Sequence, residues 1–91
     1  MKIPIVDAST LGPIVRATRK AHGMRQDDTA GSIGVSENFL GKVESGNASV
    51  TWAKLFQVLD GLGIQLIADV PVDIDVPLAS SPTSLYQRRF G

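Results

Sequence analysis

Two short helical patterns, residues 26–33 and 37–44, constrain the fold of this chain most, because only three residues separate them. Two aspartates lie in the first turn of the first segment, where carboxylates stabilise the positive end of a helix. Between the segments, Gly34 can adopt the positive φ that a sharp turn between helices requires. Ser36 belongs to the residue types preferred as N-caps. The sequence therefore predicts two helices joined by a tight turn.

A longer helical pattern precedes this pair and ends at about residue 22, before a glycine. Its apolar residues recur at three- and four-residue steps, as on one face of a helix. Asp7, Ser9 and Thr10 are all possible N-caps. Pro13 fits best in the first turn of a helix, where its missing N–H is not needed. We therefore expect Ser9 or Thr10, and not Asp7, to be the cap.

A fourth helix, capped by Ser49 or Thr51, is predicted to extend to about Leu62. Its apolar residues cover more than one stripe, whereas a helix in a small bundle needs only one apolar face for its own core. The surplus predicts a second packing surface, most simply a partner subunit. The apolar residues are Trp52, Leu55, Phe56, Val58, Leu59 and Leu62.

Residues 64–70, IQLIADV, are rich in branched side chains and predict a β-strand. Because one strand is not stable alone, it would pair either with residues 72–76, VDIDV, or with its own copy in a second chain. The end of the chain is rich in Pro and Ser, which is typical of disorder. The predicted organisation is an N-terminal arm (1–7), a mainly α domain of four to five helices (8–63), one strand (64–70) and an extended or disordered tail (71–91).

The composition narrows the class of function. The chain has 91 residues, enough for one small domain. Nine basic residues balance nine acidic ones, which argues against indiscriminate coating of nucleic acid but allows a local basic face. Cysteine is absent, which excludes disulfides and thiolate metal sites. No apolar run approaches the ~20 residues that span a bilayer, and no signal peptide is recognisable, so we expect a cytoplasmic protein without membrane contact.

Nothing in the sequence predicts catalysis. His22 is the single histidine, and it lies at a predicted helix C-terminus, where a positive charge is favoured. It has no second metal ligand at a matching spacing. No nucleophile–base pair, phosphate-binding loop or carboxylate pair is present at a recognisable spacing. We expect neither an enzyme, nor a cofactor, nor a bound metal.

The central residues, HGMRQDDTAGSIGVSENFLGKVESGN, resemble the helix-turn-helix of phage-repressor-like (Cro/C1, XRE-type) DNA-binding domains over roughly residues 8–63. The resemblance implies a phage-repressor-like fold in which the third helix enters the major groove of double-stranded DNA. The positions that carry it are Gly23, the apolar residue 24, Gln26, Ala30, residues 33–36, Leu40, Val43, Glu44 and Gly46.

The face of the third helix that this resemblance assigns to DNA is polar and contains a glycine. Asn38 can pair with adenine, and Lys42 with guanine or a phosphate. Glu37 either accepts from cytosine or stabilises the helix dipole. Gly41 either lets the helix axis approach the DNA or is a tolerated helix defect. The expected DNA-binding residues are Arg25, Gln26, Ser36, Glu37, Asn38, Gly41, Lys42, Ser45 and Asn47.

The resemblance also implies a structural ion pair between Arg19 and Glu44, buried between the first and third helices, where either charge alone would be costly. Three positions depart from the family pattern. Arg25 replaces the usual Thr or Ser cap, and Thr29 replaces a leucine of the core. Phe39 stands where a small polar residue is common. It either covers the edge of the core, which we favour, or touches a thymine methyl group.

Residues 49–70, SVTWAKLFQVLDGLGIQLIADV, are similar to the C-terminal part of HipB-type antitoxins. This similarity implies a bacterial homodimer whose C-terminal strands pair across the dimer axis. It also implies repression of its own operon at a pseudo-palindromic operator, and binding to a HipA-type serine/threonine kinase toxin. The expected dimerisation residues are Trp52, Phe56, Ile64, Leu66 and Ala68.

Two other functions stay open. The chain can be a protein-interaction module whose main role is to neutralise a partner, or a stand-alone XRE-type repressor without a toxin. The tail favours the first of these, because Tyr86, Arg88 and Phe90 are of the types that anchor protein interfaces. A tail that serves only as a degradable segment is the alternative.

Overall fold

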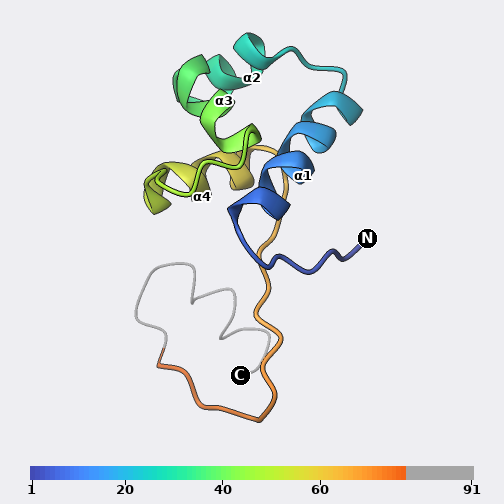
Figure 1. Ribbon diagram of the computed structural model, residues 1–91, viewed down its shortest axis with the longest axis vertical. Coiled ribbons are helices and arrows are strands. Elements are labelled where there is room, and N and C mark those ends of the chain that lie inside the picture. Colours follow the sequence, from blue (N-terminus) through green and yellow to red (C-terminus); the bar gives the residue numbers. More distant parts are fainter. Residues whose placement is uncertain (78–91) are drawn as a thin grey trace.

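The computed structural model describes residues 1–77, so the predictions for the tail residues Tyr86, Arg88 and Phe90 lie outside the described part. The described part contains four helices, which confirms the mainly α prediction. They are α1 (Ala8–Ala21), α2 (Gln26–Ile33), α3 (Glu37–Glu44) and α4 (Trp52–Gly61). Helix α3 packs against α1 and α2, and α2 also contacts α4 (Figure 1). Within residues 1–77, no helix combines the length and apolar character needed to cross a bilayer.

Asp7, and not Ser9 or Thr10, is the N-cap of α1. Its Oδ1 atom accepts a hydrogen bond from Ser9 Oγ at 2.6 Å and one from the backbone N–H of Thr10 at 3.1 Å. These hydrogen bonds lower the pKa of the Asp7 carboxyl. The position of Pro13 had favoured Ser9 or Thr10 as the cap, and this prediction was wrong. The Asp7 carboxylate is a strong cap, and α1 contains the proline in its second turn.

One aliphatic core holds the four helices together. Leu40 and Val43 of α3, the helix that packs against α1 and α2, are both buried. Ala30 is 2% exposed. Thr29 is buried as well, and its hydroxyl donates to the carbonyl oxygen of Arg25 at 2.8 Å, so the polar atom is satisfied. The remaining buried apolar residues are Leu11, Val15, Val58, Leu59 and Leu62.

The turn between α2 and α3 forms as predicted. Gly34 has φ +94°, a conformation that residues with a Cβ rarely adopt. The backbone N–H groups of Gly34 and Val35 both donate to the carbonyl oxygen of Ala30, at 2.9 and 3.0 Å. The Oγ atom of Ser36 then accepts from the backbone N–H of Phe39 at 3.0 Å and caps α3.

Helices α1 and α3 cross at a glycine that the sequence analysis did not single out. A Cβ on Gly12 would lie 2.7 Å from the carbonyl oxygens of Val43 and Glu44 and from the backbone nitrogen of Gly46. Only a residue without a side chain allows the two backbones to approach so closely. The loop after α3 is therefore held directly against α1.

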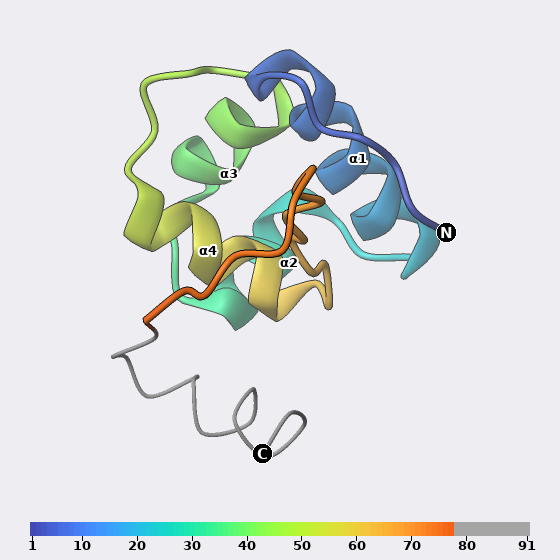
Figure 2. The same cartoon turned by 90° about the horizontal axis from the view of Figure 1, so that it is seen from below.

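After α4, residues 64–77 run away from the helices and form no helix themselves (Figure 1). Figure 2 shows the same segment from below. No strand forms in residues 1–77, so residues 64–70 do not pair with residues 72–76. Ile64 is half-buried against the core, and its backbone N–H donates to the carbonyl oxygen of Leu59 at 2.8 Å. Leu66 is 44% exposed.

Candidate nucleic-acid interface

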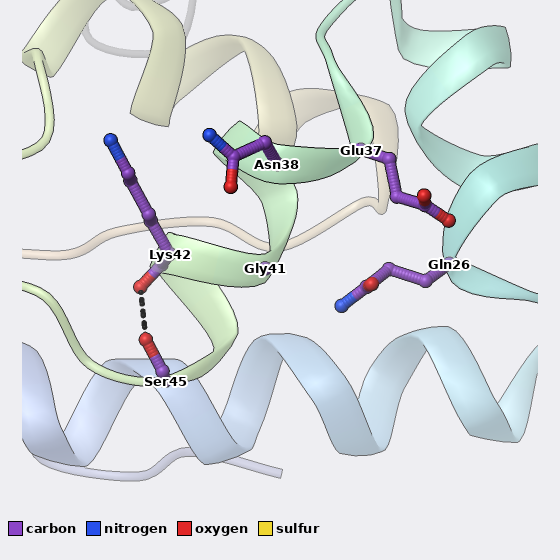
Figure 3. Close-up of a pocket in the computed structure, with 6 residues that line it drawn as sticks. All are labelled: Gln26, Glu37, Asn38, Gly41, Lys42 and Ser45. Carbon is purple, nitrogen blue, oxygen red and sulfur yellow. Dashed lines mark hydrogen bonds between the residues drawn. The ribbon is translucent and has the colours of Figure 1, made fainter.

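The polar face of α3 and the N-terminus of α2 line a shallow, open depression of about 410 Å³ (Figure 3). A depression that is open and polar differs from the apolar, enclosed cavities that hold small ligands. It instead suits the edge of a larger polar molecule. The six lining residues all belong to the set that the helix-turn-helix resemblance assigns to DNA: Gln26, Glu37, Asn38, Gly41, Lys42 and Ser45.

Gly41 forms part of the depression, and packing inside the chain does not require a glycine there. A Cβ on Gly41 would meet only the side-chain amide of Gln26, at 3.7 Å and 3.9 Å, which is ordinary van der Waals contact. The contrast with Gly12, where a Cβ would clash with backbone atoms, is sharp. The absent side chain at position 41 keeps the depression open but does not serve the fold.

Asn38 and Lys42 lie on the side of the depression away from α2 (Figure 3). Both are exposed, and neither side chain is engaged in a hydrogen bond or ion pair with residues 1–77. Within the described residues, their donors therefore have no partner. Ser45 differs, because its hydroxyl donates to the carbonyl oxygen of Lys42 at 2.9 Å.

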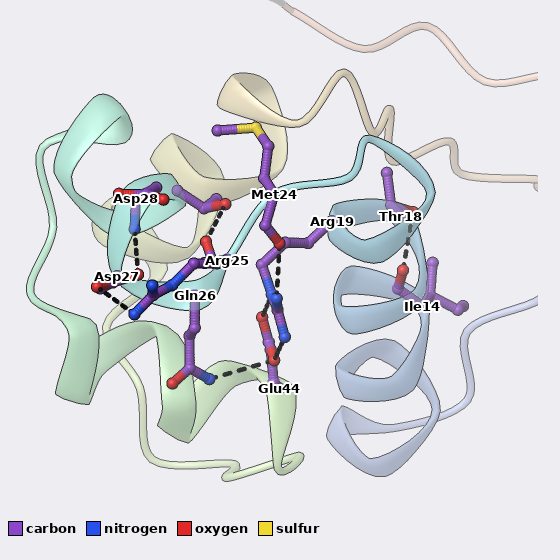
Figure 4. Close-up of polar contacts among 10 residues, drawn as sticks. Ile14, Thr18, Arg19, Met24, Arg25, Gln26, Asp27, Asp28 and Glu44 are labelled. Atoms are coloured by element: carbon purple, nitrogen blue, oxygen red, sulfur yellow. Dashed lines mark hydrogen bonds and ion pairs between the residues drawn. The ribbon is translucent and has the colours of Figure 1, made fainter.

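Arg19 and Glu44 form the ion pair between α1 and α3 (Figure 4). Arg19 Nε donates to Glu44 Oε2 at 2.6 Å, and Arg19 Nη2 donates to Glu44 Oε1 at 3.0 Å. A third donor, Nη1, reaches the carbonyl oxygen of Met24 at 2.9 Å. Both side chains are buried. The carboxylate raises the pKa of Arg19, and the paired geometry offsets the cost of burying both charges.

The same carboxylate also holds Gln26. Gln26 Nε2 donates to Glu44 Oε1 at 3.2 Å (Figure 4). Because a carboxylate only accepts hydrogen bonds, the amide nitrogen must face Glu44. The amide oxygen and the second N–H of Gln26 are left for the depression, and Figure 3 shows this side chain extending from α2 towards Gly41.

Three residues that the sequence assigned to DNA do not line the depression. Ser36 caps α3. Arg25 is the N-cap residue of α2 but makes no side-chain capping bond, and its guanidinium pairs with Asp27 at 3.2 Å on the surface. Asn47 Oδ1 accepts from the backbone N–H and the hydroxyl of Ser49, at 2.8 and 2.6 Å. They border α2 and α3 without forming one site with the other six.

The residues expected at a dimer contact are mostly exposed. Trp52 and Phe56 lie one turn apart on α4, with ring centroids 5.7 Å apart. Their exposed fractions are 76% and 43%. An aromatic pair left on the surface is typical of an interaction site. Leu66 and Ala68 are exposed too, whereas Ile64 is half-buried in its own chain.

Sequence reasoning missed one contact beside this interface. Lys54 Nζ of α4 lies 5.8 Å from the centroid of the Phe39 ring of α3. Fifteen positions separate the two residues in the sequence, so no helical periodicity could link them. An aromatic residue at an unusual position of the motif, Phe39, was the one available signal.

Comparison with known families supports the geometry. Residues 15–67 match the family model HTH_3, described as helix-turn-helix. The chain is also similar to the uncharacterized HTH-type transcriptional regulator y4mF of Sinorhizobium fredii (strain NBRC 101917 / NGR234). The two are 38% identical over 56 residues, which cover 62% of this chain and 74% of the relative.

Solved structures share the fold. A chain of the HipA–HipB–O2–O3 complex aligns with a TM-score of 0.70 and 18% identity, over 78% of this chain and 100% of that one. The restriction-modification controller protein C.AhdI from Aeromonas hydrophila aligns with a TM-score of 0.57 and 27% identity, over 65% of this chain and 86% of that one. The clp gene regulator ClgR from C. glutamicum aligns with a TM-score of 0.56 and 27% identity, over 69% and 80%.

Proposed function

Because the chain belongs to the helix-turn-helix family HTH_3 and is an XRE-type transcriptional regulator rather than an enzyme, we propose that it represses transcription as a homodimer on a pseudo-palindromic operator. The observation that carries this proposal is the depression on α3. All six of its lining residues are ones that the helix-turn-helix resemblance assigns to DNA. A bacterial cytoplasmic protein, located at the nucleoid when bound, follows from this function.

The lining residues supply the donors and acceptors that read base edges. We propose that Asn38 pairs with adenine and that Lys42 donates to guanine or to a phosphate. Glu37 supplies an acceptor for cytosine at the start of α3. Gly41 between them lets the helix lie deeper in the groove. These assignments agree with the exposure of Asn38 and Lys42, whose side chains have no hydrogen-bond partner within residues 1–77.

Gln26 and the N-terminus of α2 are proposed to bind a phosphate beside the groove. Arg25 supplies no side-chain cap to α2. The backbone N–H of Asp28 donates to Asp27 Oδ1 at 2.9 Å, which leaves the N–H groups of Gln26 and Asp27 to donate to an anion. The Glu44 carboxylate holds the Gln26 amide in place beside them. Such contacts position the protein on the duplex, whereas α3 supplies the sequence preference.

A homodimer is proposed because two apolar surfaces lack partners in residues 1–77. One is the Trp52–Phe56 pair on α4. The other is the segment 64–70, whose exposed Leu66 and Ala68 lie on one face of an extended chain. Pairing of two copies of this segment would complete a small sheet. Two α3 helices would then meet successive major grooves about 34–36 Å apart.

Fluorescence anisotropy tests the DNA-binding part of this proposal. The probe is a labelled duplex from immediately upstream of the gene, with a scrambled duplex of the same composition as its control. We expect tighter binding to the upstream duplex. Neutralisation of about six phosphates by a dimer would give a log–log salt slope near −5. Equal binding to both duplexes contradicts a sequence-specific repressor.

More narrowly, we propose that the chain is a HipB-like antitoxin that represses its own operon and binds a HipA-like serine/threonine kinase. The support is the likeness to a chain of the HipA–HipB–O2–O3 complex, together with the resemblance of residues 49–70 to HipB-type antitoxins. Co-purification with a HipA-like kinase encoded beside the gene tests it. The similarity to the controller protein C.AhdI and to ClgR favours the alternative, a regulator without a toxin. If the chain does not bind such a kinase, this alternative is the better description.

The role of the tail as a partner-binding segment is a separate proposal, and residues 78–91 lie outside the described structure. Deletion of these residues separates the two activities. If operator affinity persists while kinase binding falls, the tail carries the partner contact. If both activities persist, the tail is dispensable for them.

A further inference from the structure

We propose that Lys54 of α4 contacts the DNA backbone on the edge of the groove opposite Gln26, and that the Phe39 ring holds it there. This inference rests on the proposed DNA binding of α3 and adds a residue to it. The sequence pattern does not place Lys54 among the DNA-binding residues. The contact with Phe39 brings it to α3.

The helical geometry of α3 places Phe39 and Glu44 on opposite sides of the depression. Successive residues of a helix are rotated by about 100°, so the four lining residues of α3 and its C-cap Ser45 form one continuous face. Glu44 borders that face beside Glu37, and Phe39 borders it beside Lys42. Glu44 contacts Gln26 of α2, whereas Phe39 contacts Lys54 of α4. Gln26 and Lys54 therefore lie on the two flanks of the same face.

A helix in the major groove has a phosphate backbone on each side, because the groove is only about 12 Å wide. The α2 N-terminus and Gln26 serve one backbone. A cation on the other flank would meet the second backbone. Among residues 1–77, Arg25 and Arg19 are the basic side chains paired with carboxylates. Lys54 is exposed and is outside both pairs.

The contact with Phe39 suits a phosphate-binding lysine. Phe39 is half-buried and packs against the core, so its ring is a fixed surface. An ammonium within about 6 Å of a ring centroid is attracted by the negative face of the ring. Unlike a carboxylate, the ring does not neutralise the charge. The lysine is thus restrained and still carries its full charge for an anion.

Salt-dependent DNA binding tests this inference. Lys54→Met removes the charge and keeps the chain length, Lys54→Arg keeps the charge, and Lys2→Met is the matched control. Lys2 belongs to the N-terminal arm, which lies away from α2 and α3 (Figure 1). The probes are a labelled duplex selected by the wild-type protein from a randomised library and a scrambled duplex of equal length.

For Lys54→Met we expect a log–log salt slope shallower by about 0.9 for each protomer bound. Affinity should fall by a similar factor on both duplexes, because a phosphate contact carries no sequence information. Lys54→Arg and Lys2→Met should keep the wild-type slope. Circular dichroism of Lys54→Met should match the wild type, since the side chain is exposed.

An unchanged slope in Lys54→Met overturns the inference, as does a loss of affinity confined to the selected duplex. An equal change in Lys2→Met also overturns it, because overall charge would then explain the effect. These results leave the proposed function intact. A wild-type protein that enriches no duplex from the library overturns the proposed function itself, and the Lys54 contact with it.

Discussion

Gly12 of α1 lies so close to the end of α3 that a Cβ on it would be 2.7 Å from the carbonyl oxygen of Glu44. Arg19 follows Gly12 by seven residues, which is about two helical turns, so both face α3. The close approach at Gly12 thus brings the Arg19 guanidinium into bidentate contact with the Glu44 carboxylate. One backbone contact and one ion pair together set the position of the helix that carries the proposed DNA-reading face.

Gly12→Ala should destabilise the protein, although alanine is the better helix former by about 1 kcal/mol. The added methyl meets backbone atoms that cannot move aside, and overpacking of this kind costs about 1–3 kcal/mol. Gly31→Ala is the matched control, because nothing lies within 4 Å of a Cβ at that helical position. Urea unfolding should show a loss for the first variant and a small gain for the second. Equal effects would contradict the close approach of α1 and α3.

Glu44→Leu and Arg19→Met should each destabilise the protein strongly, by about 3–5 kcal/mol, because each leaves a buried charge without its partner. The double variant should be more stable than the sum of the single effects implies. Thermal unfolding of the four proteins measures this coupling. Strict additivity would show that the two side chains do not act as a pair.

Gly41→Ala should separate stability from DNA binding. A methyl there meets only the Gln26 amide at ordinary contact distance, so the free energy of unfolding should rise by up to about 1 kcal/mol. The methyl also enters the depression, so operator affinity should fall.

Asn38→Ala and Lys42→Ala should likewise weaken operator binding while thermal stability stays close to wild type. A large loss of thermal stability in the Asn38→Ala or Lys42→Ala variant would show that the side chain is needed for folding and not only for DNA binding.

The stability supplied by the Asp7 cap should depend on pH. Hydrogen bonds from Ser9 and Thr10 lower the pKa of Asp7 below its ordinary value of 3.8. Its charged form therefore stabilises the folded state above that pH, and the stabilisation is lost as the pH falls through the lowered pKa. Melting temperatures of wild type and Asp7→Asn should differ by a constant amount at neutral pH and approach each other in acid. If the two melting temperatures differed by the same amount at every pH, ionisation of the Asp7 carboxylate would not contribute to stability.

Leu66→Asp should split the proposed dimer and weaken operator binding together, because it places a charge in the paired strands. Gln65→Asp is the control, since adjacent residues of an extended strand face opposite sides. Sedimentation velocity should show a monomer for the first variant and a dimer for the second. A dimer in both would show that residues 64–70 do not hold the two copies together.

Local signals were sufficient for most of the helix bounds and for the polar face of α3. The bounds of α2 and α3 follow from Gly34 and Ser36, which act through their own φ angle and hydroxyl and need no distant partner. The polar stripe of α3 follows from helical periodicity alone. The cap of α1 was the exception, because several candidate caps and a proline competed within seven residues.

The sequence by itself determined which segments are helical, where they turn and which face of α3 is polar, because these depend on neighbours within about one helical turn. Only the tertiary structure decided which glycine is needed for packing, which amide Glu44 holds, which lysine stands over Phe39 and how far Ile64 is buried. Each of these depends on which helices cross and how closely. That is a property of the packed core, and no spacing along the chain encodes it.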